Sequence, residues 1–312
     1  MSPRTAARAL ALAALAAGAC ARGPTTPPTS VVVDPEPPRE TPAGDLEILR
    51  LRAAMGMAGD VRAELAPRIA DDTRGPDAGR DALRTLAIEL ALVQGDAAGA
   101  RAHLDRLRRD VGDLGERATP EERGHLALLD GAWLFDQGKY SDARSSHLRA
   151  IADLEGQAGS SLAGAALRGL AADLLALGDP DGAVSTLGRA IEIHSDAPGA
   201  AIELHEDLLL AVDVMIALQQ PDEARIVAGQ AYDQALKQFG ADTLPHAEAL
   251  VQVGAASIAA RDAGAGASLL ADAGAIVDAL QAARGDTRFP VSARVVRRLA
   301  ALRAALPAAA SI

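Results

Sequence analysis

Residues 167–190 decide the fold, and they read LRGLAADLLALGDPDGAVSTLGRA. Apolar residues recur at helical spacing up to Gly178, and a second helical series begins after it. Gly178 suits the left-handed end of one helix, Asp179 the N-cap of the next, and Pro180 its first turn. We therefore predict two antiparallel helices joined by a tight turn, with small residues such as Ala183 where they cross.

The same turn followed by an alanine recurs along the chain. The alanines are Ala100, Ala143, Ala183, Ala224 and, in a weaker match, Ala267, at steps of 43, 40, 41 and 43 residues. This regularity indicates stacked repeats, each one a helix pair that cannot bury its apolar face alone. Residues 290–306 follow the last repeat with one apolar stripe, so we expect a capping helix there.

Composition agrees with an all-α fold. Apolar residues make up 49% of the chain, mostly as Ala and Leu, whereas aromatic residues make up only 2%. Ala and Leu are strong helix formers, and no segment shows the sustained alternation of a β-strand. The net charge of −11 argues against nucleic-acid binding, which requires a basic face.

The repeat units resemble the tetratricopeptide repeat (TPR). The residues that match its pattern are Leu167, Leu170, Ala171 and Leu174 in the first helix and Ala183, Leu187 and Ala190 in the second. The period exceeds the common 34 residues and is similar to the longer, kinesin-light-chain-like variant. The resemblance covers residues 77–284. It implies an α-solenoid of five to six antiparallel helix pairs with a C-terminal capping helix. We interpret residues 45–72 as a degenerate first pair that is broken around Met55 to Gly59.

Residues 1–20 have the features of a bacterial secretory leader. Arg4 and Arg8 precede a short apolar run, and small residues lead to Cys20, the chain's single cysteine. This segment resembles a lipoprotein signal, with Ala17 where the usual box has Leu. The resemblance implies that Cys20 is lipidated and becomes the mature N-terminus. Cleavage after Ala19 with release of a secreted protein and retention of an uncleaved cytoplasmic chain remain the alternatives.

Three segments follow from these features. Residues 1–20 form the predicted signal peptide, and residues 21–43 form a tether rich in Pro and Thr, which favour extended conformations over helix. Residues 44–306 form the predicted TPR-like domain. The predicted address is the bacterial cell envelope, with the domain held by its lipid anchor.

No catalytic motif is present in the sequence. The six histidines show no metal-binding spacing, one cysteine makes neither a disulfide nor a Cys-based zinc site, and phosphate loops and nucleophile elbows are absent. Adjacent acids such as Glu206 and Asp207 point in different directions on a helix, so we expect solvated faces. We predict no enzyme activity, cofactor or metal; an active site assembled from dispersed residues is the remaining alternative.

The resemblance implies that the first helix of each pair lines a concave groove. The matching residues are Thr85, Glu89, His125, Phe135, Asp136, Arg168, Glu206, Asp213 and Gln252. TPR domains that clamp a peptide carboxylate use several bases in the groove, whereas this set has only Arg168. The acids predict a neutral or basic protein or peptide partner. The alternative is that they are solvated and bind nothing.

Arginines crowd the C-terminal helix in an otherwise acidic chain. The basic patch comprises Arg294, Arg297, Arg298 and Arg303. A solvated capping face explains such a patch. The alternative is that it docks an acidic partner or an anionic lipid while the groove binds something else.

The sequence therefore predicts a non-catalytic scaffold or adaptor attached to the cell envelope. A cytoplasmic or secreted regulatory TPR protein is the alternative, and processing of the leader separates the two.

Overall fold

The computed structural model describes residues 42–70, 78–157, 159–283 and 290–306. All regular elements in these ranges are helical. They are α2 (Pro42–Arg52), the π-turn η1 (Ala53–Met57), α3 (Ala58–Ile69), α4 (Ala78–Val93), α5 (Ala97–Leu114), η2 (Gly115–Arg117), α6 (Pro120–Asp136), α7 (Tyr140–Asp153), η3 (Glu155–Gln157), α8 (Ser161–Ala176), α9 (Pro180–Asp196), α10 (Ala201–Ala217), α11 (Pro221–Phe239), α12 (Leu244–Ala259), α13 (Ala263–Ala282) and α14 (Ala293–Ala305). The predicted leader, Cys20 and nearly all of the tether lie outside the described residues.

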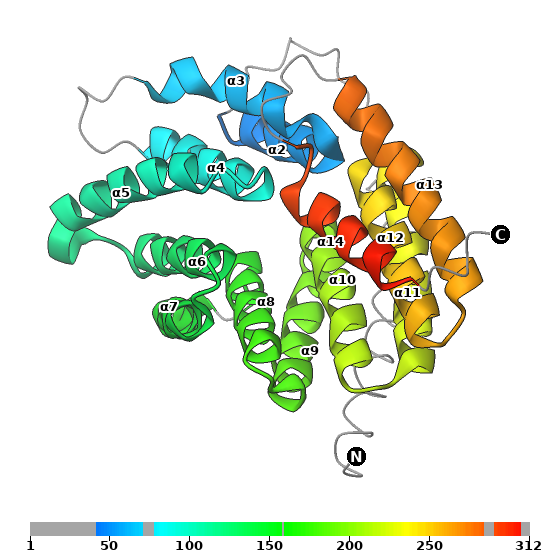
Figure 1. Cartoon of the computed structure of the whole chain (residues 1–312). Helices are drawn as coiled ribbons and strands as arrows, with labels where there is room; N and C mark the ends of the chain where they lie inside the picture. The colour runs from blue at the N-terminus through cyan, green and yellow to red at the C-terminus, as the bar shows by residue number, and fades with distance from the viewer. Residues whose placement is uncertain (1–41, 71–77, 158, 284–289, 307–312) are drawn as a thin grey trace, which may run out of the picture.

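The helices form an arc of antiparallel pairs (Figure 1). The pairs are α2/α3, α4/α5, α6/α7, α8/α9, α10/α11 and α12/α13, and α14 follows them. Each pair packs on the next, as α7 does on α8 and α11 on α12. The prediction of an all-α solenoid with five to six pairs and a capping helix is confirmed.

Local sequence signals set the helix boundaries. Thr119 and Glu122 form a reciprocal capping box at the start of α6. Asp179 accepts a hydrogen bond from the Gly182 backbone at the start of α9, with Pro180 at the first helical position. These contacts satisfy backbone N–H groups that have no partner within the helix. The turns predicted from the sequence therefore lie where expected.

The spaced alanines mark the crossing of the two helices in each pair. Ala100, Ala143, Ala183 and Ala224 are all fully buried. The fifth, Ala267, is only partly buried, and the neighbouring Gly266 is buried in its stead. Small residues at a crossing let the helix backbones approach closely, which explains why an alanine recurs at this position in the repeats.

The first pair is irregular. Helices α2 and α3 meet at the π-turn, where Gly56 has φ of +105°, a conformation that glycine tolerates best. This agrees with the predicted break in a degenerate first pair. Helix α2 begins at Pro42, inside the segment predicted as tether, because proline is well tolerated in a first helical turn.

Helix α14 lies against the late pairs, beside α10 and α12, instead of extending the arc (Figure 1). Its apolar side, with Val295 and Leu299 buried, packs against α12 and α13. Its start also meets the α4–α5 turn, where a Cβ added to Gly95 would lie 2.9 Å from the Cβ of Ala293. The C-terminal helix therefore contacts both the late and the early pairs.

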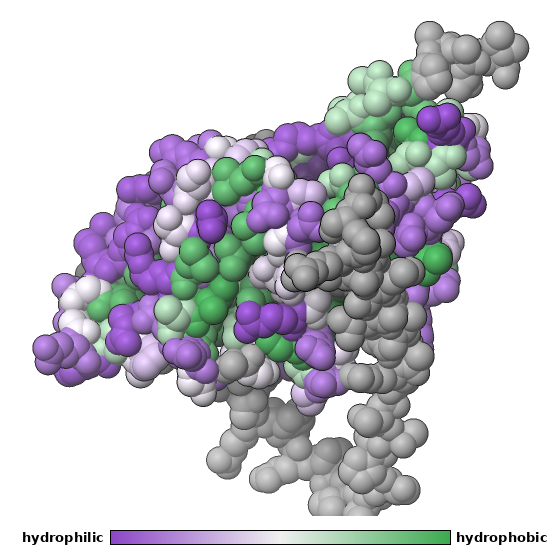
Figure 2. Space-filling view, turned by 90° about the horizontal axis from the view of Figure 1, so that it is seen from below, coloured by the Kyte–Doolittle hydropathy of each residue, from purple (hydrophilic) through white to green (hydrophobic). Residues whose placement is uncertain are grey.

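Exposed apolar residues are distributed over several helices. Figure 2 shows hydrophobic patches separated by hydrophilic residues. Ile48, Leu148 and Ile226 are all more than 40% exposed, but they belong to α2, α7 and α11. Among the described helices, α13 alone has the length and apolar composition to cross a membrane, yet here it packs along α12.

Candidate binding site on the inner face

Charged side chains from the first helices of the pairs share one side of the arc, which we call the inner face. Its members are Arg50 of α2, Glu89 of α4, His125 and Asp136 of α6, Arg168 of α8, Glu203, Glu206 and Asp213 of α10, and Glu248 of α12. Several are partly accessible to solvent, and they interact across the arc. Six of these residues were predicted to line the groove, whereas Arg50, Glu203 and Glu248 were not.

Glu89 shows how closely the pairs converge. Its side chain is 38% exposed and lies 3.7 Å from the guanidinium of Arg50. Burial raises the pKa of Glu89, Arg50 opposes that shift, and the carboxylates of Glu206 and Glu203 raise the pKa further. Carboxylates from α4 and α10 therefore repel one another across the inner face.

Arg168 connects the inner face to the core. Its guanidinium lies 2.7 Å from the Glu206 carboxylate and 3.3 Å from that of Asp207. Burial pushes the pKa of Glu206 up, but nearby cations, Arg168 foremost, lower it overall. Asp207 is fully buried and also binds Nδ1 of His194 at 2.6 Å. The prediction of a solvated Glu206–Asp207 pair is wrong for Asp207, because adjacent helical positions point in different directions and Asp207 points into the core.

A second polar contact joins α10 to α12. The Gln252 side-chain amide donates to Oδ2 of Asp213 and to the Leu209 carbonyl, both at 3.2 Å. Burial raises the pKa of Asp213, and Arg298 of α14 opposes that shift. A carboxylate held in such a place is stabilised by a neighbouring cation.

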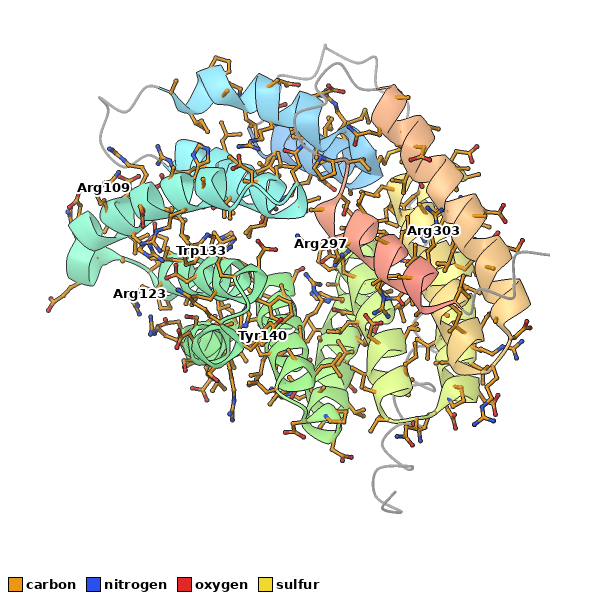
Figure 3. All side chains as sticks on the ribbon, viewed as in Figure 1. Arg109, Arg123, Trp133, Tyr140, Arg297 and Arg303 are labelled. Atoms are coloured by element: carbon orange, nitrogen blue, oxygen red, sulfur yellow. The ribbon has the colours of Figure 1, made fainter. Side chains whose placement is uncertain are left out.

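The predicted basic patch meets these acids. Arg294 lies 2.9 Å from Glu248, Arg297 lies 3.2 Å from Asp136, and Arg298 pairs with Asp213. Arg297 is labelled in Figure 3, where α14 crosses the arc. Arg303 instead donates to the Leu270 carbonyl of α13 at 2.8 Å. The groove and most of the patch, predicted as separate surfaces, are therefore in contact within one chain.

Three predicted groove residues occupy other environments. Thr85 and Gln252 are buried, and the ring of Phe135 packs at a tilt of 57° against that of Tyr140, with centroids 5.1 Å apart. Arg50 and Glu248 were not among the predicted residues. Glu248 lies one helical turn before Gln252, so the same-face rule at four-residue spacing was the available signal. Nothing in the repeat pattern pointed to Arg50, since it lies in the irregular first pair.

His125 is the inner-face histidine. Burial, aided by the positive charge of Arg50, lowers its pKa to about 4. Burial and the charge of Arg50 explain this shift without a catalytic role for His125. No group of three or more His, Cys, Asp or Glu residues in the described ranges is arranged to hold a metal ion.

Buried histidines explain the polar residues at apolar repeat positions. Nδ1 of His147 lies 2.5 Å from Asp173, and both side chains are buried. Glycine allows the ring to fit, since a Cβ at Gly131 or Gly169 would lie about 2.5 Å from it. Asp130, which also lies where the repeat usually has an apolar residue, pairs with Arg108 of α5. These polar residues connect helices to their neighbours.

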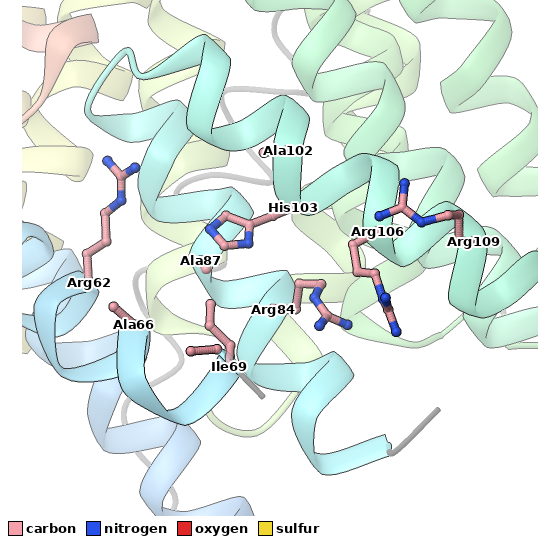
Figure 4. Close-up of a pocket in the computed structure, with 10 residues that line it drawn as sticks. Arg62, Ala66, Ile69, Arg84, Ala87, Ala102, His103, Arg106 and Arg109 are labelled. Carbon is pink, nitrogen blue, oxygen red and sulfur yellow. The ribbon is translucent and has the colours of Figure 1, made fainter. Parts of the chain in front are cut away.

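A separate cavity of about 430 Å³ lies between α3, α4 and α5 (Figure 4). Basic side chains dominate its lining, which includes Arg62, Arg84, His103, Arg106 and Arg109. Buried Asp110 binds Arg84 at 2.7 Å and Arg106 at 3.0 Å, and Asp96 binds Arg62. Carboxylates therefore hold three of the four lining arginines, and these ion pairs form a structural network that joins the first two pairs.

Comparison with known proteins identifies no relative by sequence. No family model matches the chain, and no curated protein is significantly similar to it.

Solved structures share the fold. BtubC (BKLC) from P. vanneervenii matches with a TM-score of 0.52 at 15% identity, over 76% of this chain and 95% of that one. The apo form of RapI matches with a TM-score of 0.52 at 9% identity, over 85% of this chain and 72% of that one. A putative kinesin light chain with TPR-like repeats from Podosopora anserina reaches 0.48 at 15% identity, over 64% and 95% of the two chains. The chain has a TPR-like helical-repeat fold.

Proposed function

We propose that this protein is a non-catalytic scaffold that binds a protein or peptide partner on its inner face. The observation that supports the proposal is the inner face itself. Accessible charged groups from α4, α6, α8 and α10 converge there, although most have no role in the hydrophobic core. Helical arrays present such faces to extended or helical ligands.

The proposed address is the bacterial cell envelope, with the domain anchored through a lipid on Cys20. The support is the leader sequence with its basic start, short apolar run and small residues before the only cysteine. A tether of about 20 residues rich in proline would hold the array away from the membrane. A chain that is not processed would be a cytoplasmic regulatory protein using the same inner face.

Labelling with radioactive palmitate tests the address. We expect label in the wild-type protein and none in a Cys20→Ala variant. Equal labelling, or none in either protein, contradicts the lipid anchor and leaves the inner face to be tested separately.

Site-specific crosslinking in intact cells tests the scaffold. A photoreactive residue replaces Glu203 on the inner face, and a control replaces the exposed Arg225 of α11. We expect a discrete crosslinked partner from position 203 and not from position 225. Absence of any specific adduct from position 203 contradicts a scaffold role for the inner face.

A further inference from the structure

We propose that the inner face binds a basic amphipathic helix of a partner protein, and that α14 occupies this place in the unbound chain. The inference rests on the scaffold function proposed above and names its ligand. It follows from where α14 lies, how its charges are arranged, and which acids of the inner face have their basic partners in the array.

The first observation is the match between α14 and the inner face. Arg294, Arg297 and Arg298 lie at i, i+3 and i+4, so they project from one side of the helix. They reach carboxylates on three different helices, Glu248 of α12, Asp136 of α6 and Asp213 of α10. A single helix thereby contacts three separate helix pairs. A ligand that makes the same contacts must be a helix with clustered cations.

The acids are better fixed than the arginines that bind them. The side chains of Glu248 and Asp136 are 10% and 19% exposed, whereas those of their partners Arg294 and Arg297 are 57% and 64% exposed. The acids therefore remain in place when the arginines leave, and the exposed guanidinium groups are open to exchange. The site is preorganised, while the internal ligand is accessible.

The apolar contact of α14 is small. Only Ala293, Val295 and Leu299 of its thirteen residues are buried, while α12 buries twelve of sixteen. Val296 is 41% exposed. A partner helix with two apolar residues four apart beside the three cations could reproduce these contacts. Such a pattern is the usual one for a helix that docks into a groove.

Helix α14 leaves part of the inner face acidic. Three carboxylates gather there, those of Glu89, Glu203 and Glu206. The array provides two cations for them: Arg50 lies near Glu89, and Arg168 lies near Glu206. Burial and mutual repulsion raise the pKa of Glu89, so an added cation is favoured there. Arg294 of α14 already acts on Glu206. A longer basic helix that also reaches Glu89 and Glu203 makes further contacts, and this difference favours its displacement of α14.

Peptide binding tests the proposal. The probe is a fluorescent peptide with the sequence of residues 290–306, PVSARVVRRLAALRAAL, and the readout is anisotropy at about 50 mM salt, where charge attraction is weakly screened. The protein is the full chain with Cys20→Ala. We compare it with the same chain carrying Arg294→Ser, Arg297→Ser and Arg298→Ser, which weakens the internal competitor but keeps Val295 and Leu299.

We expect the triple Ser variant to bind the peptide at least about tenfold more tightly than its parent, because the bound fraction depends on how often α14 leaves. Adding Glu248→Gln and Asp213→Asn to that variant should remove most of the gain. A control peptide with its three corresponding arginines replaced by glutamate should not bind. If the triple variant does not fold, Arg297→Ser alone, at the most exposed arginine of the three, should still increase affinity.

Equal affinity of the parent and a folded variant contradicts the proposal and makes α14 a permanent cap. Binding that survives neutralisation of the acids contradicts it as well. A partner captured in cells through position 203 whose capture is unaffected by Glu248→Gln and Asp213→Asn would leave the scaffold function standing and remove only the basic-helix ligand.

Discussion

Two regions are held together by different interactions. One is the middle of the array; the other is the contact between α14 and the inner face, which we call the closure. Between α8 and α11, alanines, leucines and valines form a continuous buried core, and the buried carboxylate of Asp207 pairs with His194 inside it. At the closure, half-exposed arginines reach carboxylates on other pairs. A densely packed core is destabilised by small changes in side-chain volume. Exposed ion pairs contribute little to the free energy of folding and are screened by salt. The comparison indicates a rigid array with a separable closure.

The largest loss of stability is expected from substitutions in the middle of the array. Ala183→Arg and Ala224→Arg each place a long charged side chain at a fully buried helix crossing. We expect each to lower the free energy of unfolding by about 3 kcal/mol or more, through overpacking and burial of charge. Chemical denaturation measures it, and Arg225→Ala on the exposed side of α11 is the control, with a change below about 0.5 kcal/mol. Equally small effects at all three positions contradict the assigned repeat register.

A neighbouring pair of acids sharpens the comparison. Asp207→Ala removes the buried acceptor of both His194 and Arg168, and we expect a loss of about 3 kcal/mol. Glu206→Ala, one residue earlier on the inner face, should cost less than about 1 kcal/mol, because its ion pair is partly exposed. Thermal or urea unfolding of both variants measures the difference. Similar losses would mean that the inner face is as essential to folding as the core.

Acid should weaken the inner face through His125. Its pKa in the folded chain is about 4, below the ordinary 6.5 of the unfolded chain. Between these values only the unfolded chain takes up the proton, so the stability contributed by neutral His125 is present above pH 6.5 and lost as pH falls through 4.

Comparison of the wild type with His125→Gln isolates that contribution. The difference in unfolding free energy should shift against the wild type by about 1–3 kcal/mol between about pH 7 and pH 4, because each pKa unit corresponds to about 1.4 kcal/mol. Urea unfolding at a series of pH values measures it. Parallel pH profiles for the two proteins contradict the lowered pKa.

The smallest expected effect concerns the closure. The triple substitution Arg294→Ser, Arg297→Ser and Arg298→Ser should lower the unfolding free energy by only about 1–2 kcal/mol at about 50 mM salt, since the three pairs are partly exposed. At about 500 mM salt the loss should fall by roughly half, because screening weakens these pairs in the parent too. A loss as large as that of Ala183→Arg, or one unaffected by salt, shows that α14 belongs to the rigid core.

Particular residues show how far the sequence predicts this structure. The Gly178–Asp179–Pro180 turn and the Thr119 capping box involve contacts within four residues, so their spacing was sufficient to predict them. The repeat position of a residue was enough to place four charged groups on the inner face: Glu89, Arg168, Glu206 and Asp213. Arg50 did not, because the π-turn at Gly56 interrupts the first pair. The partner of Arg297 is Asp136, 161 residues earlier, and no repeat rule connects the two.

The sequence alone determined the helices, their ends and their pairing, because each depends on local contacts that recur with the repeat. It also showed both sets of charges, which are the acids on the first helix of each pair and the arginines on the C-terminal helix. Only the tertiary structure decided that these charges meet, since the curvature of the array sums small rotations over six pairs and brings α14 against acids of α6, α10 and α12. Likewise, only packing determined that Asp207 is buried while Glu206 faces solvent, because the neighbouring helices decide which face of α10 they cover.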